Sequence, residues 1–239
     1  MNLLGILRHC VSLSMKMNFD NKFEMENNSI LQQLLNRCSN LAHLEESIKY
    51  AAKVIINSYK NGGKVLVCGN GGSCSDADHI VGELMKSFEG YRPLETNLQE
   101  HLKEFSPERG VMLAEKLQQG LPAISLTVHN ALITAIANDI HGDMIFAQQV
   151  TGLGNKGDVL IGLSTSGNSQ NVVDAFIVAK VKGLKTIGMT GETGGKLKDL
   201  CDVLINVPEK RTAFVQELHL PVYHAICMMV ENELFNKNQ

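Results

Sequence analysis

The sequence contains no C-x-x-C pair, although it has six cysteines. Zinc ribbons and dithiol redox motifs depend on such pairs, so neither is indicated. The cysteines are scattered through the chain, at Cys10, Cys38, Cys68, Cys74, Cys201 and Cys227. This pattern is typical of reduced thiols, and we therefore expect a cytoplasmic location.

An excess of charge of one sign is also missing, because 22 basic residues face 25 acidic ones and leave a net charge of −3. This balance provides no general basic field for nucleic acid or for an anionic membrane. The apolar run at residues 3–7 is too short to cross a membrane and has no small-residue cleavage site behind it. The expected partners are small molecules or protein surfaces, and we expect residues 1–27 to form a flexible extension.

No internal repeat is visible, and 239 residues with 44% apolar content suit one sizeable α/β domain, expected at residues 28–239. Short apolar runs typical of buried strands occur at residues 65–68, 123–128, 158–163, 186–190 and 203–207. Because helical segments separate these runs, they predict a doubly wound, parallel, five-stranded sheet. Ligands of such sheets bind beyond the carboxyl ends of the strands.

Two helices are predicted before the first strand, at residues 29–37 and 44–58. Asn28 or Ser29 is the expected N-cap of the first, and the glycines at residues 62–63 are the expected end of the second. Their apolar stripes are broad, so each needs the sheet or another subunit as a partner.

A second helical addition is predicted between Pro93 and the second strand. It reads as two short helices, with Ser106 as an N-cap, Pro107 at the first helical position and Gly120 as the end. We expect a helical insertion at residues 94–121 that lies on the surface of the domain.

The first predicted strand runs into Gly69-Asn-Gly-Gly-Ser73 and then a helix. Glycines permit positive φ and close approach to a ligand, and a helix N-terminus favours a phosphate. Ser73, Ser75 and Asp76 are candidate caps of this helix. The loop lacks the Gly-Lys-Ser/Thr ending of a P-loop, and a tight turn with nothing bound is the alternative interpretation.

Three further polar patterns accompany this loop. The third strand runs into Ser164-Thr-Ser-Gly-Asn-Ser169, a hydroxyl-rich helix start that suits phosphate oxygens or is an ordinary capped helix. His79 and Glu83 are four residues apart and share a helix face, as in many solvated pairs. The last helix, residues 212–235, carries the polar side chains Gln216, Glu217, His219 and His224. Pro221 within it predicts a kink or a late helix start.

An ordered set of motifs resembles the sugar isomerase (SIS) domain family. The set consists of G-N-G-G-S with His79 and Glu83, A-I-A-N-D at 135–139, G-D-V-L, S-T-S-G-N-S, T-G-x-x-G-G and Q-E-x-H. The phosphoheptose isomerase branch is the most similar, over about residues 28–235. The resemblance implies a flavodoxin-like sheet with N-terminal helices and a homotetramer with active sites between subunits. The insertion, the N-terminal extension and Pro221 depart from the compact bacterial members.

The resemblance also implies roles for individual residues. The implied substrate-binding residues are Asn70, Gly71, Gly72, Ser73, Asn138, Asp139, Ser164, Thr165, Ser166, Ser169 and Gln216. The implied zinc ligands are His79, Glu83, Gln216 and His224, with Glu83 and His224 as the acid/base pair. By spacing alone, Glu217 aligns better with His224 than Gln216 does, because seven residues bring two side chains to one helix face.

The implied reaction is an aldose–ketose isomerisation of a sugar phosphate, expected to convert sedoheptulose 7-phosphate to D-glycero-D-manno-heptose 7-phosphate through an enediolate. A carboxylate and an imidazole are suited to move the protons, and zinc to polarise the carbonyl. Two alternatives stay open. A tetrameric SIS branch binds the bacterial replication initiator but lacks the full acid/base set, whereas sugar-phosphate-sensing regulators are usually fused to a DNA-binding module, which is not evident in this sequence.

Overall fold

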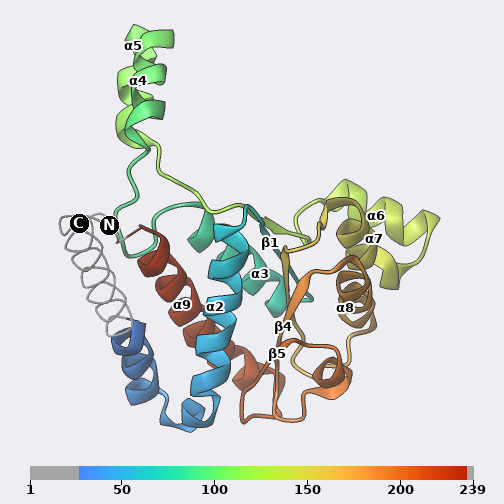
Figure 1. Ribbon diagram of the computed structural model, residues 1–239. Coiled ribbons are helices and arrows are strands. Elements are labelled where there is room, and N and C mark those ends of the chain that lie inside the picture. The colour runs from blue at the N-terminus through green and yellow to red at the C-terminus, as the bar shows by residue number, and fades with distance from the viewer. Residues whose placement is uncertain (1–26, 236–239) are drawn as a thin grey trace, which may run out of the picture.

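The computed structural model describes residues 27–235 and shows one parallel sheet with helices on both faces (Figure 1). The described chain opens with a helix at residues 27–37. The later elements are η1 (Ser39–Leu44), α2 (Glu45–Lys60), β1 (Val65–Gly69), α3 (Gly72–Met85), α4 (Thr96–Phe105), α5 (Pro107–Lys116), β2 (Ala123–Ser125), α6 (Asn130–Asp139), η2 (Gly142–Met144), α7 (Ile145–Leu153), β3 (Val159–Leu163), α8 (Gln170–Lys182), β4 (Lys185–Thr190), η3 (Gly195–Asp199), β5 (Val203–Asn206) and α9 (Thr212–Phe235). Of the expected extension at residues 1–27, only residue 27 is described.

Within residues 27–235, five strands pair in parallel in the order β2-β1-β3-β4-β5. This is the strand order of flavodoxin-like doubly wound sheets, so the predicted fold class is confirmed. The central strands β1 and β3 are buried along their whole length, as expected of continuous apolar runs in a parallel sheet.

The second strand is shorter than predicted and ends at Ser125. The hydroxyl groups of Ser125 and Thr127 both donate to Asp78 Oδ1, at 2.6 Å, and so tie this segment to α3. The backbone therefore leaves the sheet and turns towards α6.

The helices form two layers. The helix at 27–37, α2, α3 and α9 bury their apolar side chains on one face, together with Val67 of β1 and Ile161 of β3. Helices α7 and α8 cover the other face, where they pack on Leu66, Cys68 and Leu160. Among residues 27–235, no helix is both long and apolar enough to cross a membrane.

The broad apolar stripes of the two N-terminal helices have their partners inside the chain. Leu31 and Leu34 of the first helix, and Ile48 and Ile55 of α2, all belong to the core on the α9 face of the sheet. The alternative partner considered from the sequence, another subunit, is not needed to bury these stripes.

Two predicted helix starts are wrong, and the predicted start of the last helix is confirmed. The first helix already includes residues 27–29, so neither Asn28 nor Ser29 is its N-cap. Helix α3 is capped by Gly71 with φ 57° and begins at Gly72, which places the predicted cap residues inside the helix. Helix α9 begins at Thr212 and continues through Pro221, so a late start is excluded.

The two predicted short helices before β2 form a hairpin that projects away from the sheet (Figure 1). α4 and α5 pack on each other, and Phe105 between them is 92% exposed. α5 ends at Lys116 and not at Gly120. The two chain segments at the base of the hairpin pair instead, because Pro93 bridges Gln118 and Gln119 N donates to Arg92 O at 2.9 Å.

Candidate functional site

The two predicted phosphate loops are neighbours at the carboxyl edge of the sheet. β1 and β3 pair up to Gly69 and Leu163, so the loops that follow them leave the sheet side by side. The side-chain amides of Asn70 in the first loop and Asn171 in the first turn of α8 exchange two hydrogen bonds of 2.9 Å. Because α3 and α8 then leave to opposite faces of the sheet, the loops flank a crevice at the topological switch point.

The glycine loop approaches α9 very closely. A Cβ atom at Gly72 would lie 2.6 Å from Nε2 of Gln216, so a larger residue here would displace the Gln216 side chain. Gly71 has φ 57°, which favours glycine as well. The structure therefore places Gln216 beside the glycine loop, and its role as a zinc ligand stays a prediction.

Hydroxyl groups of the second loop bind one another and the loop backbone. Ser164 Oγ donates to Ser169 Oγ at 3.0 Å, and Asn168 N donates to Ser166 Oγ at 3.1 Å. Ser164 is buried, whereas Ser166 is exposed in the loop ahead of α8. These contacts shape a loop whose hydroxyls and helix-start amides can bind an anion.

Asn138 and Asp139 are exposed at the end of α6. Asn138 Nδ2 donates to Asp139 Oδ1 at 2.7 Å. Within residues 27–235, neither side chain hydrogen-bonds to the loops or to His79, Glu83 and His224. Their contact with substrate stays a prediction.

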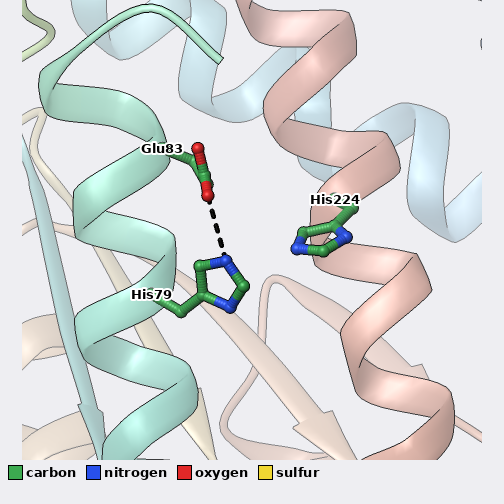
Figure 2. Close-up of side chains that lie close together, drawn as sticks. All are labelled: His79, Glu83 and His224. Atoms are coloured by element: carbon green, nitrogen blue, oxygen red, sulfur yellow. Dashed lines mark hydrogen bonds and ion pairs between the residues drawn. The ribbon is translucent and has the colours of Figure 1, made fainter. Parts of the chain in front are cut away.

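His79, Glu83 and His224 do come together, on the facing sides of α3 and α9 (Figure 2). His79 Nε2 lies 3.0 Å from Glu83 Oε1, and donor atoms of all three side chains lie within 4.8 Å of one another. The i,i+4 spacing accounts for the first pair, whereas the packing of α9 on α3 brings in His224.

His79 is also held on its other ring nitrogen. Tyr223 Oη lies 3.0 Å from His79 Nδ1 and donates to Asp76 Oδ1 at 3.2 Å. The two ring nitrogens of His79 therefore contact Glu83 Oε1 and Tyr223 Oη, and these two contacts orient the imidazole in the cluster. Burial raises the pKa values of both Asp76 and Tyr223.

The surroundings of His224 differ from those of His79. Its Nε2 is buried and has no hydrogen-bond partner among the described residues. Burial and the neighbouring His79 lower the pKa of His224, so its neutral form is favoured. The ring of Phe88 packs against it, with 5.3 Å between the ring centroids. A neutral imidazole with a free nitrogen can bind a metal ion or accept a proton.

A cavity of about 360 Å³ adjoins His224 on the side away from the sheet. Polar side chains in its wall come from the helix at 27–37, from the segment after α3 and from α9: Gln33, Arg37, Glu89 and Glu217. Glu217, which spacing had favoured as the partner of His224, thus borders the same space. The cavity offers room for polar groups next to the cluster.

Sequence reasoning missed several residues that support the cluster, namely Asp76 and Tyr223 around His79, and Phe88, Arg92 and Glu231 around Glu83 and His224. Asp76 was read as a cap, although its place three residues before His79 puts both on one face of α3. For Tyr223, Phe88, Arg92 and Glu231 no local pattern carries a signal, because their contacts are long-range.

Comparisons with known proteins identify the family of the chain. The SIS domain pattern matches residues 30–119 and 101–191. The phosphoheptose isomerase of Aliarcobacter butzleri is 41% identical over 191 residues, which is 80% of this chain and 87% of that protein. That of Helicobacter pylori is 40% identical over 198 residues, 83% of this chain and 90% of that one.

Solved structures show the same relationship. The phosphoheptose isomerase from Neisseria gonorrhoeae superimposes with a TM-score of 0.65 at 32% identity, covering 91% of this chain and 99% of that one. The one from Francisella tularensis gives a TM-score of 0.68 at 30% identity, covering 91% and 98%. The chain therefore belongs to the SIS domain family, and within it to the phosphoheptose isomerases, which are aldose–ketose isomerases.

Proposed function

We propose that the protein interconverts sedoheptulose 7-phosphate and D-glycero-D-manno-heptose 7-phosphate. The observation that carries this proposal is the convergence of His79, Glu83 and His224 across α3 and α9, next to two loops suited to phosphate. The names of the relatives supply the sugar, and the cluster supplies groups that can move protons.

The distance between the loops and the cluster supports a sugar phosphate of this size. Gly72 opens α3 beside the glycine loop, and His79 follows seven residues later. At 1.5 Å per residue this separation is about 10 Å along the helix, which an extended six- or seven-carbon sugar phosphate spans. The phosphate then binds at the loops while C1 and C2 reach the cluster.

We further propose that the cluster holds zinc. Two imidazoles and a carboxylate are ligands of the kind zinc accepts, and the unpartnered Nε2 of His224 fits a donor role. The contact of His79 Nδ1 with Tyr223 resembles the outer-shell hydrogen bonds that orient metal-binding histidines. Gln216 is the proposed fourth ligand, and its amide, which lies beside Gly72, would have to turn towards the cluster to bind the ion. Bound zinc would polarise the substrate carbonyl and stabilise negative charge on its oxygen.

The residues of the chain carry the proton transfers. The carboxylate of Glu83 takes a proton from C1 of the ketose, which yields an enediolate across C1 and C2, and later returns it to C2 to form the aldose. His224 moves the other proton between O2 and O1. Glu83 is only 8% exposed, so little water competes for the transferred proton.

The test follows aldose formation from sedoheptulose 7-phosphate and from a panel of other ketose phosphates. Loss of a positioned acid or base costs about 10²- to 10⁴-fold in turnover. Glu83→Gln and His224→Ala should each lower kcat by at least about 10² while calorimetry still detects sugar-phosphate binding. Treatment of the wild type with a chelator should depress activity, and added zinc should restore it.

A matched control is Glu115→Gln, which removes an exposed carboxylate on α5, a helix that projects away from α3 and α9 in Figure 1, and should leave kcat unchanged. Normal turnover by both cluster variants would contradict the assignment of the acid/base pair. A wild type that turns over another ketose phosphate but not the heptose would contradict the proposed substrate and leave the proposed chemistry intact.

A further inference from the structure

Arg92 and Glu231 form an ion pair in the interior of the protein. Arg92 has no exposed surface and Glu231 retains 2%, and Arg92 Nε donates to Glu231 Oε1. Removing two charges from water is costly, and a well-packed apolar pair is often at least as stable. Stability alone therefore explains this pair poorly, and its other contacts show where it acts.

The guanidinium group holds the end of α3. Arg92 Nη1 donates to Leu84 O at 2.9 Å, and Nη2 donates to Glu83 O at 3.2 Å. Because α3 ends at Met85, these carbonyls belong to its last turn, which has no partners of its own within the helix. Arg92 thus fixes the main chain at the residue whose carboxylate lies in the cluster.

The carboxylate holds the segment that packs on His224. Glu231 accepts hydrogen bonds of 2.8 Å from the backbone N–H groups of Phe88, Glu89 and Gly90. Burial alone would raise the pKa of Glu231, but these donors and the charge of Arg92 outweigh it and keep the pKa below its ordinary value. The Phe88 ring, held in this way, lies against His224.

We propose that Arg92 and Glu231 are positioning residues that set Glu83 on α3 relative to His224 on α9. One ion pair reaches both sides of the cluster, through the backbone of Glu83 and through Phe88, although neither charged group belongs to the cluster. This inference rests on the proposed function. A misplacement of about 1 Å far from the reacting atoms can cost about 10²-fold in rate, so such a pair has a functional reason to be retained.

Arg92→Lys tests the proposal because it keeps the positive charge and loses the planar fork that reaches three acceptors. We expect a folded protein by circular dichroism, with kcat at least about tenfold lower and KM within about threefold of the wild type. Zinc affinity, measured by competition with a chelating dye, should fall about tenfold or more, as it does when outer-shell partners are lost. In its crystal structure, the separation of the Glu83 carboxylate and the His224 ring should differ from that of the wild type.

Two further variants separate positioning from stability. Lys60→Met breaks an exposed ion pair to Glu233 at the same end of α9 and should leave kcat within about twofold. The double variant Arg92→Met/Glu231→Gln removes both buried charges, so it should unfold at a higher temperature than Arg92→Met alone while kcat stays low. If the double variant recovers kcat together with stability, Arg92 and Glu231 have a merely structural role and the proposal is overturned.

Unchanged kcat and zinc affinity in a folded Arg92→Lys would also overturn it, as would failure of both Arg92→Lys and the double variant to fold. A wild type without isomerase activity would contradict the proposed function instead. In that case the crystal structures of the wild type and Arg92→Lys decide, because an unmoved Glu83 and His224 refute positioning and a displaced pair supports it.

Discussion

At the scale of single residues, His219 is a buried histidine that the cluster does not use. It has no exposed surface, its Nε2–H donates to Thr190 O at 3.2 Å, and its Nδ1 has no partner among the described residues. Burial lowers the pKa of His219 to about 4, despite the hydrogen bond to Thr190. It is therefore neutral in the folded protein at neutral pH.

This pKa predicts acid sensitivity. The unfolded chain takes up the proton near pH 6.5, whereas the folded protein resists it until about pH 4, so stability is complete above pH 6.5 and is lost as the pH falls towards 4. The free energy of unfolding should be lower at pH 5 than at pH 7 by about 2 kcal/mol from this group alone. Urea titrations at both pH values measure the difference.

His219→Gln isolates this contribution, because glutamine keeps a donor for Thr190 O and does not titrate. The variant should show a smaller loss of stability between pH 7 and pH 5 than the wild type. His224 acts in the same direction and remains in both proteins, so it cancels in the comparison. An identical pH dependence in the two proteins would mean that His219 is protonated without cost.

At the scale of elements, the α4–α5 hairpin is an addition to the sheet and not part of its core. None of the α4 residues is buried, and the hairpin projects from a base where Pro93 bridges Gln118 (Figure 1). Its removal therefore exposes little apolar surface of the main core.

We predict that the chain folds without the hairpin. Replacing residues 94–117 by two glycines joins the bridged residues Pro93 and Gln118 through a two-residue loop, a length that antiparallel neighbours accept. The variant should unfold in one cooperative transition in urea and keep the far-ultraviolet circular dichroism of an α/β protein. Loss of the cooperative transition would show that the hairpin is required by the core.

The elements also show where local rules fail. Glycine at Gly71 caps α3 where serine and aspartate side chains were expected, because the tight turn leads straight into the helix. Pro221 lies inside α9 without ending it. In both places α9 packs on α3, and Gln216 of α9 lies directly against Gly72 at the start of α3.

At the scale of the whole molecule, the homotetramer stays a prediction. Three exposed apolar residues lie on α6 or next to its ends, namely Val128, Leu132 and Ile140, which are 59%, 37% and 56% exposed. Such a surface is a candidate for contact between subunits. Because the stripes of the N-terminal helices are buried within the chain, α6 is a better candidate than those stripes.

Light scattering should give a mass near four times 26.2 kDa. The double variant Leu132→Lys/Ile140→Lys should form smaller species, because buried unpaired lysines oppose association. Val181→Lys is the control, since Val181 is an 85% exposed apolar residue on α8 outside this surface. A monodisperse monomer of the wild type at micromolar concentration would contradict the tetramer.

The sequence by itself determined the five strands, the parallel sheet with helices on both faces, and the positions of the two polar loops. Buried parallel strands are continuous apolar runs, and glycine and hydroxyl residues follow β1 and β3 directly, so local composition is enough to find them. The pairing of His79 with Glu83 likewise follows from helix geometry alone.

Only the tertiary structure decided what surrounds these residues. His224 and Tyr223 reach the cluster because α9 packs along α3, more than a hundred positions away in the chain. Glu231 of the same helix pairs with the buried Arg92. Such contacts depend on how helices pack side by side, which no spacing within one segment encodes. The candidate catalytic and binding residues could therefore be predicted from the sequence, whereas the residues that hold them in place could be identified only from the packing of the helices.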